Sequence, residues 1–321
     1  MISALSLISC NSVNETTVFA MDTVMELKVY GGSAEFMNEC EKIIFDIESK
    51  LSVTDPASDI YMLNLNGKRT LDSDTAELIR RSIQICELTE GAFDITVRPL
   101  MLLWGFTTEE FSVPDETEIK NTLGNVGSNA LHTYGDIVEL HGREIDLGGI
   151  AKGYTSMKLY EYAKQNGIKS GIFNLGGNVR CIGKKPDGSG WNVAIRDPNS
   201  PDDLFAAVEV SDKAVVTSGG YQRYFEKDGI RYHHIMDAAT GYPADSGLIS
   251  VTVISDDDVL ADALSTAVFV GGAELAQKLK QSMDSFEFIL VDKKGTVFCS
   301  EGIADSVTIL DPKYSLPIIC R

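Results

Sequence analysis

The sequence has few of the residues that build thiol and imidazole metal centres. Six cysteines and four histidines are spread over 321 residues, and no two cysteines form a Cys-x-x-Cys pair. This spacing excludes the usual zinc motifs and a disulfide framework. Cys40 and Cys86 fall on apolar helical faces, where a cysteine serves as a small hydrophobic residue.

Positive charge is also scarce. The chain carries 28 Lys and Arg against 47 Asp and Glu, which gives a net charge of −19. Phosphate backbones and anionic lipid surfaces repel such a chain, so we expect no nucleic-acid partner. A phosphate-bearing ligand would need a cation or backbone N–H donors to hold it. The 44% hydrophobic and 23% charged residues are typical of a soluble globular protein.

Long apolar runs are rare, and the most suggestive one stands at the N-terminus. The segment "MISALSLISC" ends at Cys10 and is followed by the polar "NSVNETT". It has the shape of the end of a bacterial lipoprotein signal, although the basic residues expected ahead of such a signal are missing. We therefore expect residues 1–16 to be a signal remnant and tether, with a lipid on Cys10 as the only attachment to a membrane. This places the protein on the extracytoplasmic face of the bacterial cell membrane. No later run approaches the ~20 apolar residues that a membrane span needs.

The rest of the chain mixes helical and strand-like patterns without a Pro- or Ser-rich linker, so we expect one domain over residues 17–321. Many strands follow one another through short Gly, Pro and Asp turns, which favours an α+β fold with largely antiparallel or mixed sheets flanked by helices. The apolar spacing predicts helices over 33–52, 73–91, 256–272 and 273–283. Residues 144–167 pass from the end of a strand through a glycine-rich turn into a further helix that closes at Gly167.

The stretch "ADALSTAVFVGG" (Ala261–Gly272) sets a carboxylate and two hydroxyls into an apolar run. Asp262, Ser265 and Thr266 are spaced i, i+3, i+4, which brings them to one face of a helix. Hydroxyls in a helix can bond back to a carbonyl of the preceding turn, which is a purely local role. Three oxygen donors on one stripe also suit a hard cation such as Mg²⁺. Both interpretations stay open on this motif alone.

Two further segments carry residues that suit anion binding or acid–base catalysis. The glycine-rich "DLGGIAKGY" (Asp146–Tyr154) leads into a helix, so its N–H groups could face an anion, although a tight turn alone would explain its first two glycines. Lys152 inside this turn could pair with a phosphate. In "YHHIMDAATGYP", His234 stands close to Asp237 and a turn, which makes a general-base role credible. The aromatic stripe Phe93–Phe106 is better explained as core.

Taken together, the ordered segments FAMDT (Phe19–Thr23), GAFD, DLGGIAKGY, NLGGN (Asn174–Asn178), TSGGYQRY, HIMDAATGYP and ADALSTA resemble the FAD:protein FMN transferase family, also called ApbE-like. The resemblance implies an ApbE-like fold with two coupled lobes. It implies that the protein takes FAD as substrate, uses Mg²⁺, and transfers the FMN moiety to a threonine hydroxyl of an acceptor flavoprotein domain, releasing AMP. Many members are exported lipoproteins, which agrees with the interpretation of Cys10.

Carried over by position, the resemblance implies metal ligands at the side chains of Asp262 and Thr266, the neighbouring Ser265, and the carbonyl of Ala151. His234 matches the family's proposed base. Asp22 departs from the family, which commonly has glycine there. The implied flavin contacts, with Lys152 from the turn, are Met21, Tyr61, Asn64, Ala92, Phe93, Asp94, Gly148, Tyr154 and Ile235.

Three alternatives remain. An Mg²⁺-dependent FAD pyrophosphatase would use the same site with water as the nucleophile. A non-catalytic FAD-binding lipoprotein would hold FAD intact, and an exported solute-binding protein would not bind FAD. The segment "DSVT" (Asp305–Thr308) faintly resembles an acceptor threonine site, but a surface turn leading into a strand explains it better.

Overall fold

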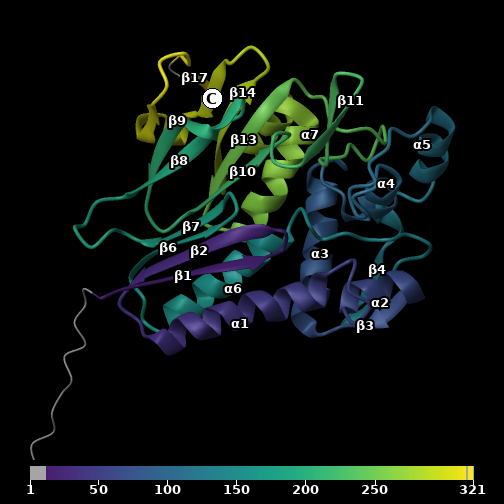
Figure 1. The fold of residues 1–321 in the computed structure, drawn as a ribbon, viewed down its shortest axis with the longest axis horizontal. Helices are drawn as coiled ribbons and strands as arrows, with labels where there is room; N and C mark the ends of the chain where they lie inside the picture. Colours follow the sequence, from purple (N-terminus) through teal and green to yellow (C-terminus); the bar gives the residue numbers. More distant parts are fainter. Residues whose placement is uncertain (1–11, 316, 321) are drawn as a thin grey trace, which may run out of the picture.

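The structure is a computed structural model that describes residues 12–315 and 317–320 (Figure 1). The lipid predicted on Cys10 therefore lies outside the described residues. Strand pairing begins at Val13, opposite Tyr30. The folded sheet thus starts inside the segment 1–16 that the sequence assigned to the tether.

A nine-stranded sheet forms the centre of the molecule. Its strand order is β1-β2-β6-β7-β10-β13-β14-β15-β17, and every neighbouring pair is antiparallel except β15 and β17. This mixed, largely antiparallel sheet with flanking helices confirms the predicted α+β class. The strands are β1 (Val13–Ala20), β2 (Thr23–Tyr30), β6 (Ser170–Leu175), β7 (Asn178–Gly183), β10 (Ala214–Gly219), β13 (Leu248–Ser255), β14 (Phe286–Asp292), β15 (Val297–Ser300) and β17 (Ile318–Cys320).

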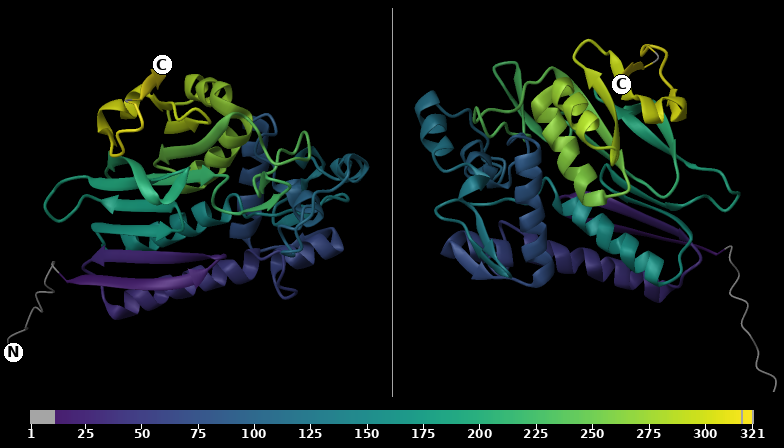
Figure 2. Two further views of the ribbon diagram at one scale, coloured as in Figure 1. Left: turned by 45° about the horizontal axis from the view of Figure 1, so that its top comes forward. Right: turned by 180° about the vertical axis from the view of Figure 1, so that it is seen from behind.

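Three helices cover one face of this sheet (Figures 1 and 2). They are α1 (Ala34–Leu51), α6 (Ala151–Gln165) and α7 (Asp258–Ser282). The side chain of Ser33 caps α1 by accepting a hydrogen bond from the Phe36 N–H, which starts the helix at the place that the predicted range 33–52 indicated. The opposite face packs against a three-stranded sheet of β8 (Trp191–Asp197), β9 (Ser200–Val210) and β16 (Val307–Ile309).

Helix α7 is interrupted where the sequence divided it into two helices, over 256–272 and 273–283. The helical segment runs to Ser282, but Gly272 leaves the helical conformation with φ +79°. Glycine adopts this backbone angle without the steric cost that a Cβ would bring, so the helical path breaks at the predicted residue and then resumes. By length and composition α7 could cross a membrane, contrary to the expectation from apolar runs, but 61% of its most apolar window is buried. It is packed as a core helix on β10 and β13.

A smaller lobe lies beside the large sheet (Figure 1). Its core is continuous with the main one, because Ile60 and Ala76 belong to the same buried cluster as Tyr154 and Ala263 of the large lobe. The two lobes are therefore coupled through shared packing. The smaller lobe contains α2 (Asp59–Asn66), β3 (Lys68–Thr70), α3 (Ser73–Leu88), η1 (Ile95–Val97), α4 (Arg98–Leu103), α5 (Glu116–Leu123), η2 (Ser128–Ala130), β4 (His132–Tyr134) and β5 (Ile137–Glu139).

A hairpin of β11 (Tyr224–Lys227) and β12 (Ile230–His233) joins the lobes through an aromatic cluster. The side chains of Trp104 and Phe106 are fully buried against it, which confirms that this part of the aromatic stripe is core. The indole of Trp104 donates a hydrogen bond to the carbonyl of Gly241 at 2.9 Å. This cluster fixes the end of β12, where His234 follows.

Candidate active site

The start of helix α6 contacts helix α7 at a point where a side chain would not fit. The Gly153 N–H donates a hydrogen bond to Oδ2 of Asp262 at 2.7 Å. A Cβ on Gly153 would lie 2.5 Å from the carbonyl oxygen of Asp258 and 2.6 Å from the Cβ of Asp262. The glycine-rich turn and the acidic stripe, which are 109 residues apart in sequence, are thus in direct contact.

Thr266 lies next to the same turn. A Cβ built on Gly149 would be 3.8 Å from Oγ1 of Thr266 and 3.3 Å from the ring of Phe93. Ala151 is the first residue of α6, and its carbonyl accepts a hydrogen bond from the Thr155 hydroxyl at 2.8 Å. Asp262 and Thr266 of the predicted metal site therefore lie on the side of α7 that meets the turn.

Ser265 is placed differently. Its hydroxyl donates to the carbonyl of Asp262 at 2.8 Å and lies 2.8 Å from the hydroxyl of Ser218 on β10. The side chain is fully buried toward the sheet. The local interpretation of the motif, a hydroxyl bonded back to its own helix, holds for Ser265, whereas its role as a metal ligand stays a prediction.

Asp262 is a buried carboxyl that no cationic side chain contacts within the part of the chain that the structure describes. Only 5% of the residue is exposed, and burial raises the pKa of its carboxyl to about 6. The charge of Lys152 and the bond from Gly153 oppose this rise. An uncompensated buried carboxylate is costly, so the site favours an added positive charge.

The donors at this place fit a hard cation. They are a carboxylate, a hydroxyl and a backbone carbonyl, which Mg²⁺ and Ca²⁺ accept. Beside Asp262, the amide of Asn178 is 1% exposed, and neither its nitrogen nor its oxygen makes a hydrogen bond to the described residues. Across residues 12–315 and 317–320, no three His, Cys, Asp or Glu side chains converge on a metal position. A cation bound here would therefore be held by oxygen ligands of different types, which are the carboxylate, the hydroxyl and the backbone carbonyl.

The ring of His234 is oriented by a backbone carbonyl. Its Nδ1 lies 3.0 Å from the carbonyl oxygen of Arg223, which can only accept, so Nδ1 carries the proton and Nε2 keeps a free lone pair. Burial lowers the pKa of His234 to about 3, and the nearby charges of Lys152 and Arg223 contribute. The imidazole is therefore neutral at physiological pH, as a proton acceptor must be.

The sequence paired His234 with Asp237, but that carboxylate is used elsewhere. Its oxygens accept hydrogen bonds from the Ala239 N–H at 2.8 Å and the Thr240 hydroxyl at 2.9 Å, which closes the following turn. The group that orients the imidazole is the Arg223 carbonyl, and the guanidinium of Arg223 bonds to the carbonyl of Phe106. A sequence does not reveal this arrangement, because any residue can supply a carbonyl.

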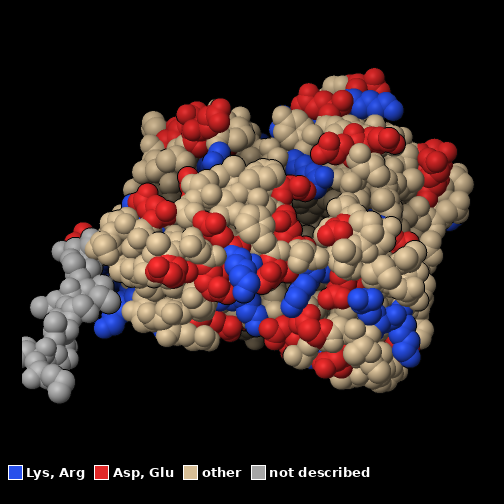
Figure 3. All heavy atoms as spheres, turned by 60° about the horizontal axis from the view of Figure 1, so that its bottom comes forward, with Lys and Arg blue, Asp and Glu red and all other residues tan. Residues whose placement is uncertain are grey.

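Most N–H groups of the glycine-rich turn are already bonded. The Gly148 N–H donates to Oδ1 of Asp146 at 2.8 Å, and that of Gly153 donates to Asp262. An anion held at this turn would therefore depend on Lys152 and on other cations. On the face shown in Figure 3, acidic side chains are numerous and surround only a few basic groups, which suits a molecule of net charge −19.

Some of the predicted flavin contacts hold backbone segments in place. Asn64 forms two 2.8 Å hydrogen bonds with the backbone of Ile145, one through each amide atom. Asp94 caps η1 by accepting from the Thr96 N–H at 2.8 Å, and its other oxygen accepts from the Ser128 N–H at 3.1 Å. These two side chains shape the site, and their contact with flavin stays a prediction.

The tip of the β1–β2 hairpin reaches the same region. The Met21 N–H donates to Glu48 on α1 at 2.5 Å, and the Thr155 hydroxyl lies 3.8 Å from the Met21 sulfur. Asp22 occupies the left-handed region with φ +58°, which explains why glycine suits this position and why Asp, with its short polar side chain, is tolerated. Of the other predicted contacts, Phe93, Tyr154 and Ile235 are buried, Tyr61 and Ala92 are half-buried, and Gly148 is exposed.

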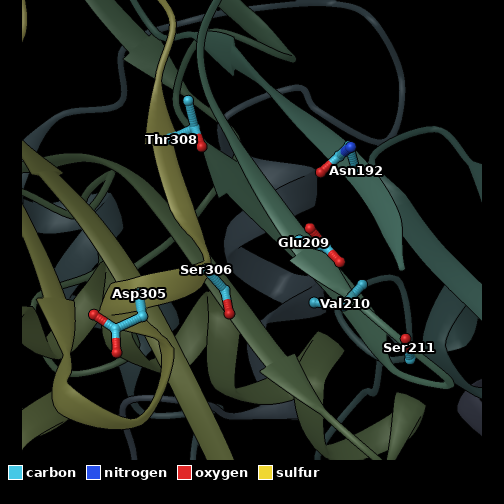
Figure 4. A pocket seen from close by; sticks show the side chains of 7 residues that line it. All are labelled: Asn192, Glu209, Val210, Ser211, Asp305, Ser306 and Thr308. Carbon is cyan, nitrogen blue, oxygen red and sulfur yellow. The ribbon is translucent and has the colours of Figure 1, made fainter. Parts of the chain in front are cut away.

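A separate hollow of about 320 Å³ lies on the opposite side of the large sheet, between β8, β9 and β16 (Figure 4). Its lining is mostly polar and includes Asn192, Glu209 and Thr308. It contains none of the residues predicted for flavin or metal. The "DSVT" segment borders it as a turn, η3 (Glu301–Ser306), followed by β16, which is the surface turn and strand that the sequence indicated.

The chain is similar to known proteins over most of its length. Residues 21–290 match the model of the ApbE family. The chain is 34% identical over 266 residues to the FAD:protein FMN transferase of Treponema pallidum, covering 77% of this chain and 73% of the relative. It is 29% identical over 316 residues to that of Klebsiella pneumoniae, covering 96% and 98%.

Solved structures agree. The crystal structure of the ApbE protein from Thermotoga maritima superposes with a TM-score of 0.85 at 34% identity and covers 92% of this chain and 99% of that one. The flavin transferase ApbE from Vibrio cholerae superposes with a TM-score of 0.82 at 26% identity, with the same coverage. The family match over most of the chain, the relatives and the shared fold lead to one conclusion: this chain belongs to the ApbE family.

Proposed function

We propose that the protein transfers the FMN moiety of FAD to a threonine hydroxyl of an acceptor flavoprotein domain and releases AMP. The observation that carries this proposal is the contact of the glycine-rich turn with Asp262, with His234 near enough for Lys152 to influence both side chains. The proteins that the chain is similar to are named FAD:protein FMN transferases.

We further propose that the cofactor is Mg²⁺, held by the Asp262 carboxylate, the Thr266 hydroxyl and the Ala151 carbonyl. When bound, Mg²⁺ would neutralise charge on the diphosphate and on the departing AMP. The protein supplies a buried carboxylate with no ion-pair partner among the described residues, beside an amide whose polar atoms are unbonded. Lys152 adds positive charge for the phosphates from the glycine-rich turn.

His234 acts as the general base. Its Nε2 accepts the proton of the acceptor threonine while the hydroxyl oxygen attacks the phosphorus on the FMN side. A new P–O bond to threonine forms, the P–O bond to the bridging oxygen breaks, and AMP leaves with that oxygen. The Arg223 carbonyl holds Nδ1–H throughout, so the lone pair on Nε2 stays available. Removing a positioned base costs about 10²–10⁴-fold in rate.

The test is incubation of the protein with FAD, Mg²⁺ and an acceptor flavoprotein domain, followed by in-gel flavin fluorescence. The parent should label the acceptor, His234→Ala should bind FAD but lose transfer, and Asp262→Ala should lose the Mg²⁺ response. Free FMN without labelled acceptor would indicate a pyrophosphatase. Intact FAD after hours in Mg²⁺ would indicate a binding protein.

We also propose that the protein is a lipoprotein on the extracytoplasmic face of the cell membrane, anchored through Cys10. The support is the sequence pattern of residues 1–10. Expression of the full chain in bacteria with a radiolabelled fatty acid tests this, with Cys10→Ser as the control. Label on the parent and none on the variant is the expected result, and an unlabelled membrane-free parent would contradict it.

A further inference from the structure

Two carboxylates on α7 meet two polar side chains on β7 in matching register. Asp258 and Asp262 are one helical turn apart, a rise of about 6 Å. Arg180 and Asn178 are two residues apart on the strand, a rise of about 6.6 Å, and therefore point to the same face of the sheet. Arg180 bonds to Asp258 at 3.0 Å, and the amide of Asn178 lies beside Asp262 and lowers the pKa of its carboxyl.

The two pairs differ in charge. Asp258 has a full ionic partner, because it and Arg180 are each 2% exposed and form a salt bridge. The Ser156 hydroxyl also donates to Asp258, at 2.6 Å. Asp262 accepts a hydrogen bond from the Gly153 N–H and otherwise lies beside the neutral amide of Asn178. On this face of α7, the charge of Asp258 is neutralised by Arg180, whereas no salt bridge neutralises the charge of Asp262 among the described residues.

Asn178 is also unusual in its own bonding. The residue is 1% exposed, yet neither amide atom makes a hydrogen bond of good geometry to any of the described residues. A buried amide without partners is costly, and native proteins retain one only where a further group satisfies it. Of the charged groups named above, Asp262 is the one that lies beside the Asn178 amide.

We propose that Asn178 is a positioning residue for the cation site, which fixes the carboxylate of Asp262 for the incoming divalent cation. Gly153 holds Oδ2 from the α6 side. With the cation bound, the Asn178 amide N–H groups would donate to the carboxylate from the β7 side, and the amide oxygen would accept a hydrogen bond from the hydration shell of the cation. This inference rests on the proposed function, because it assigns Asn178 to the same metal site.

The test measures binding rather than activity. Metal-free protein is titrated with Mn²⁺ by electron paramagnetic resonance, and Mg²⁺ is added in competition. Partners that orient a metal ligand typically contribute 10–100-fold to affinity, so we expect Asn178→Leu to weaken Mn²⁺ binding by that factor. The thermal midpoint of the metal-free protein should not fall, because the amide makes no good hydrogen bond there.

Ser170→Ala is the matched control. The Ser170 hydroxyl is also buried without a partner in the described structure, but it lies on β6, opposite Gly183. This variant should keep the parent's Mn²⁺ affinity. Asn178→Ala provides a second variant if the leucine does not fit.

The outcomes separate two failures. If Asp262→Ala binds Mn²⁺ as the parent does, the proposed metal site itself is wrong. If Asp262→Ala loses Mn²⁺ but a folded Asn178 variant keeps the parent's affinity, only the role of Asn178 is overturned. Failure of both Asn178 variants to fold would also overturn it, since the amide would then serve stability alone.

Discussion

The contact between α6 and α7 leaves no room for a side chain at Gly153, which makes Gly153→Ala the most direct perturbation of the site's architecture. The added Cβ would meet the Asp258 carbonyl oxygen at 2.5 Å and the Asp262 Cβ at 2.6 Å. Neither atom can rotate away, because the Asp258 oxygen belongs to the backbone and the Asp262 Cβ is attached directly to its own Cα. The helices must separate, and the 2.7 Å bond from Gly153 to Asp262 must lengthen.

The size of the effect follows from these two losses. Overpacking a well-packed contact costs about 1–3 kcal/mol, and a hydrogen bond to a charged group contributes about 1.5–3 kcal/mol. Because the helices relax partly, we expect the free energy of unfolding to fall by roughly 2–5 kcal/mol. Mn²⁺ affinity should fall as well, since the carboxylate of Asp262 moves with α7.

Circular dichroism during thermal unfolding and an Mn²⁺ titration measure both effects. Gly124→Ala is the control, because Gly124 ends α5 at φ −59° and its Cβ would meet only the Asn121 carbonyl oxygen, at 3.2 Å. The control should unfold within about 1 kcal/mol of the parent. A Gly153→Ala protein with the parent's stability and Mn²⁺ affinity would refute the packing argument.

Three further outcomes are expected. By NMR of the metal-free protein, His234 should show the Nδ1–H tautomer and remain neutral far below pH 6.5, because burial lowers its pKa to about 3; protonation at or above pH 6.5 would contradict this. Asn64→Leu should lower the free energy of unfolding by about 2–4 kcal/mol, since the Ile145 backbone loses two bonds; an unchanged denaturant midpoint would count against it. Arg180→Met should cost about 3–5 kcal/mol at pH 8, because it strands the buried charge of Asp258. That loss should shrink as pH falls toward about 6, because burial raises the pKa of Asp258 to about 6 even beside Arg180, and without that cation the folded variant takes up the proton at a higher pH; a pH-independent loss would refute this.

The sequence predicted the local features well. The start of α1 and the mixture of helices with strands joined by short turns follow from apolar periodicity and turn residues, which act over a few positions. The division of α7 at Gly272 was also predicted from the sequence, because a glycine can take the positive φ that interrupts a helix, and the structure has that interruption at this residue.

The site itself was predicted in part. Motif resemblance indicated Asp262, Thr266 and His234, and the structure brings the first two to the glycine-rich turn. The resemblance could not indicate that the Ser265 hydroxyl bonds within its own helix, or that the Arg223 carbonyl orients His234. Nor could it show that Asn178 faces Asp262. These contacts depend on long-range packing of side chains and carbonyls that leave no pattern in sequence.

The proposed chemistry depends on a divalent cation between α7 and the start of α6. The most direct measurement is a crystal structure of the protein soaked with Mn²⁺ and FAD, in which anomalous scattering locates the metal. We expect one peak within coordination distance of the Asp262 carboxylate, the Thr266 hydroxyl and the Ala151 carbonyl. Bound FAD with no peak there, or a peak on other residues, would contradict the account.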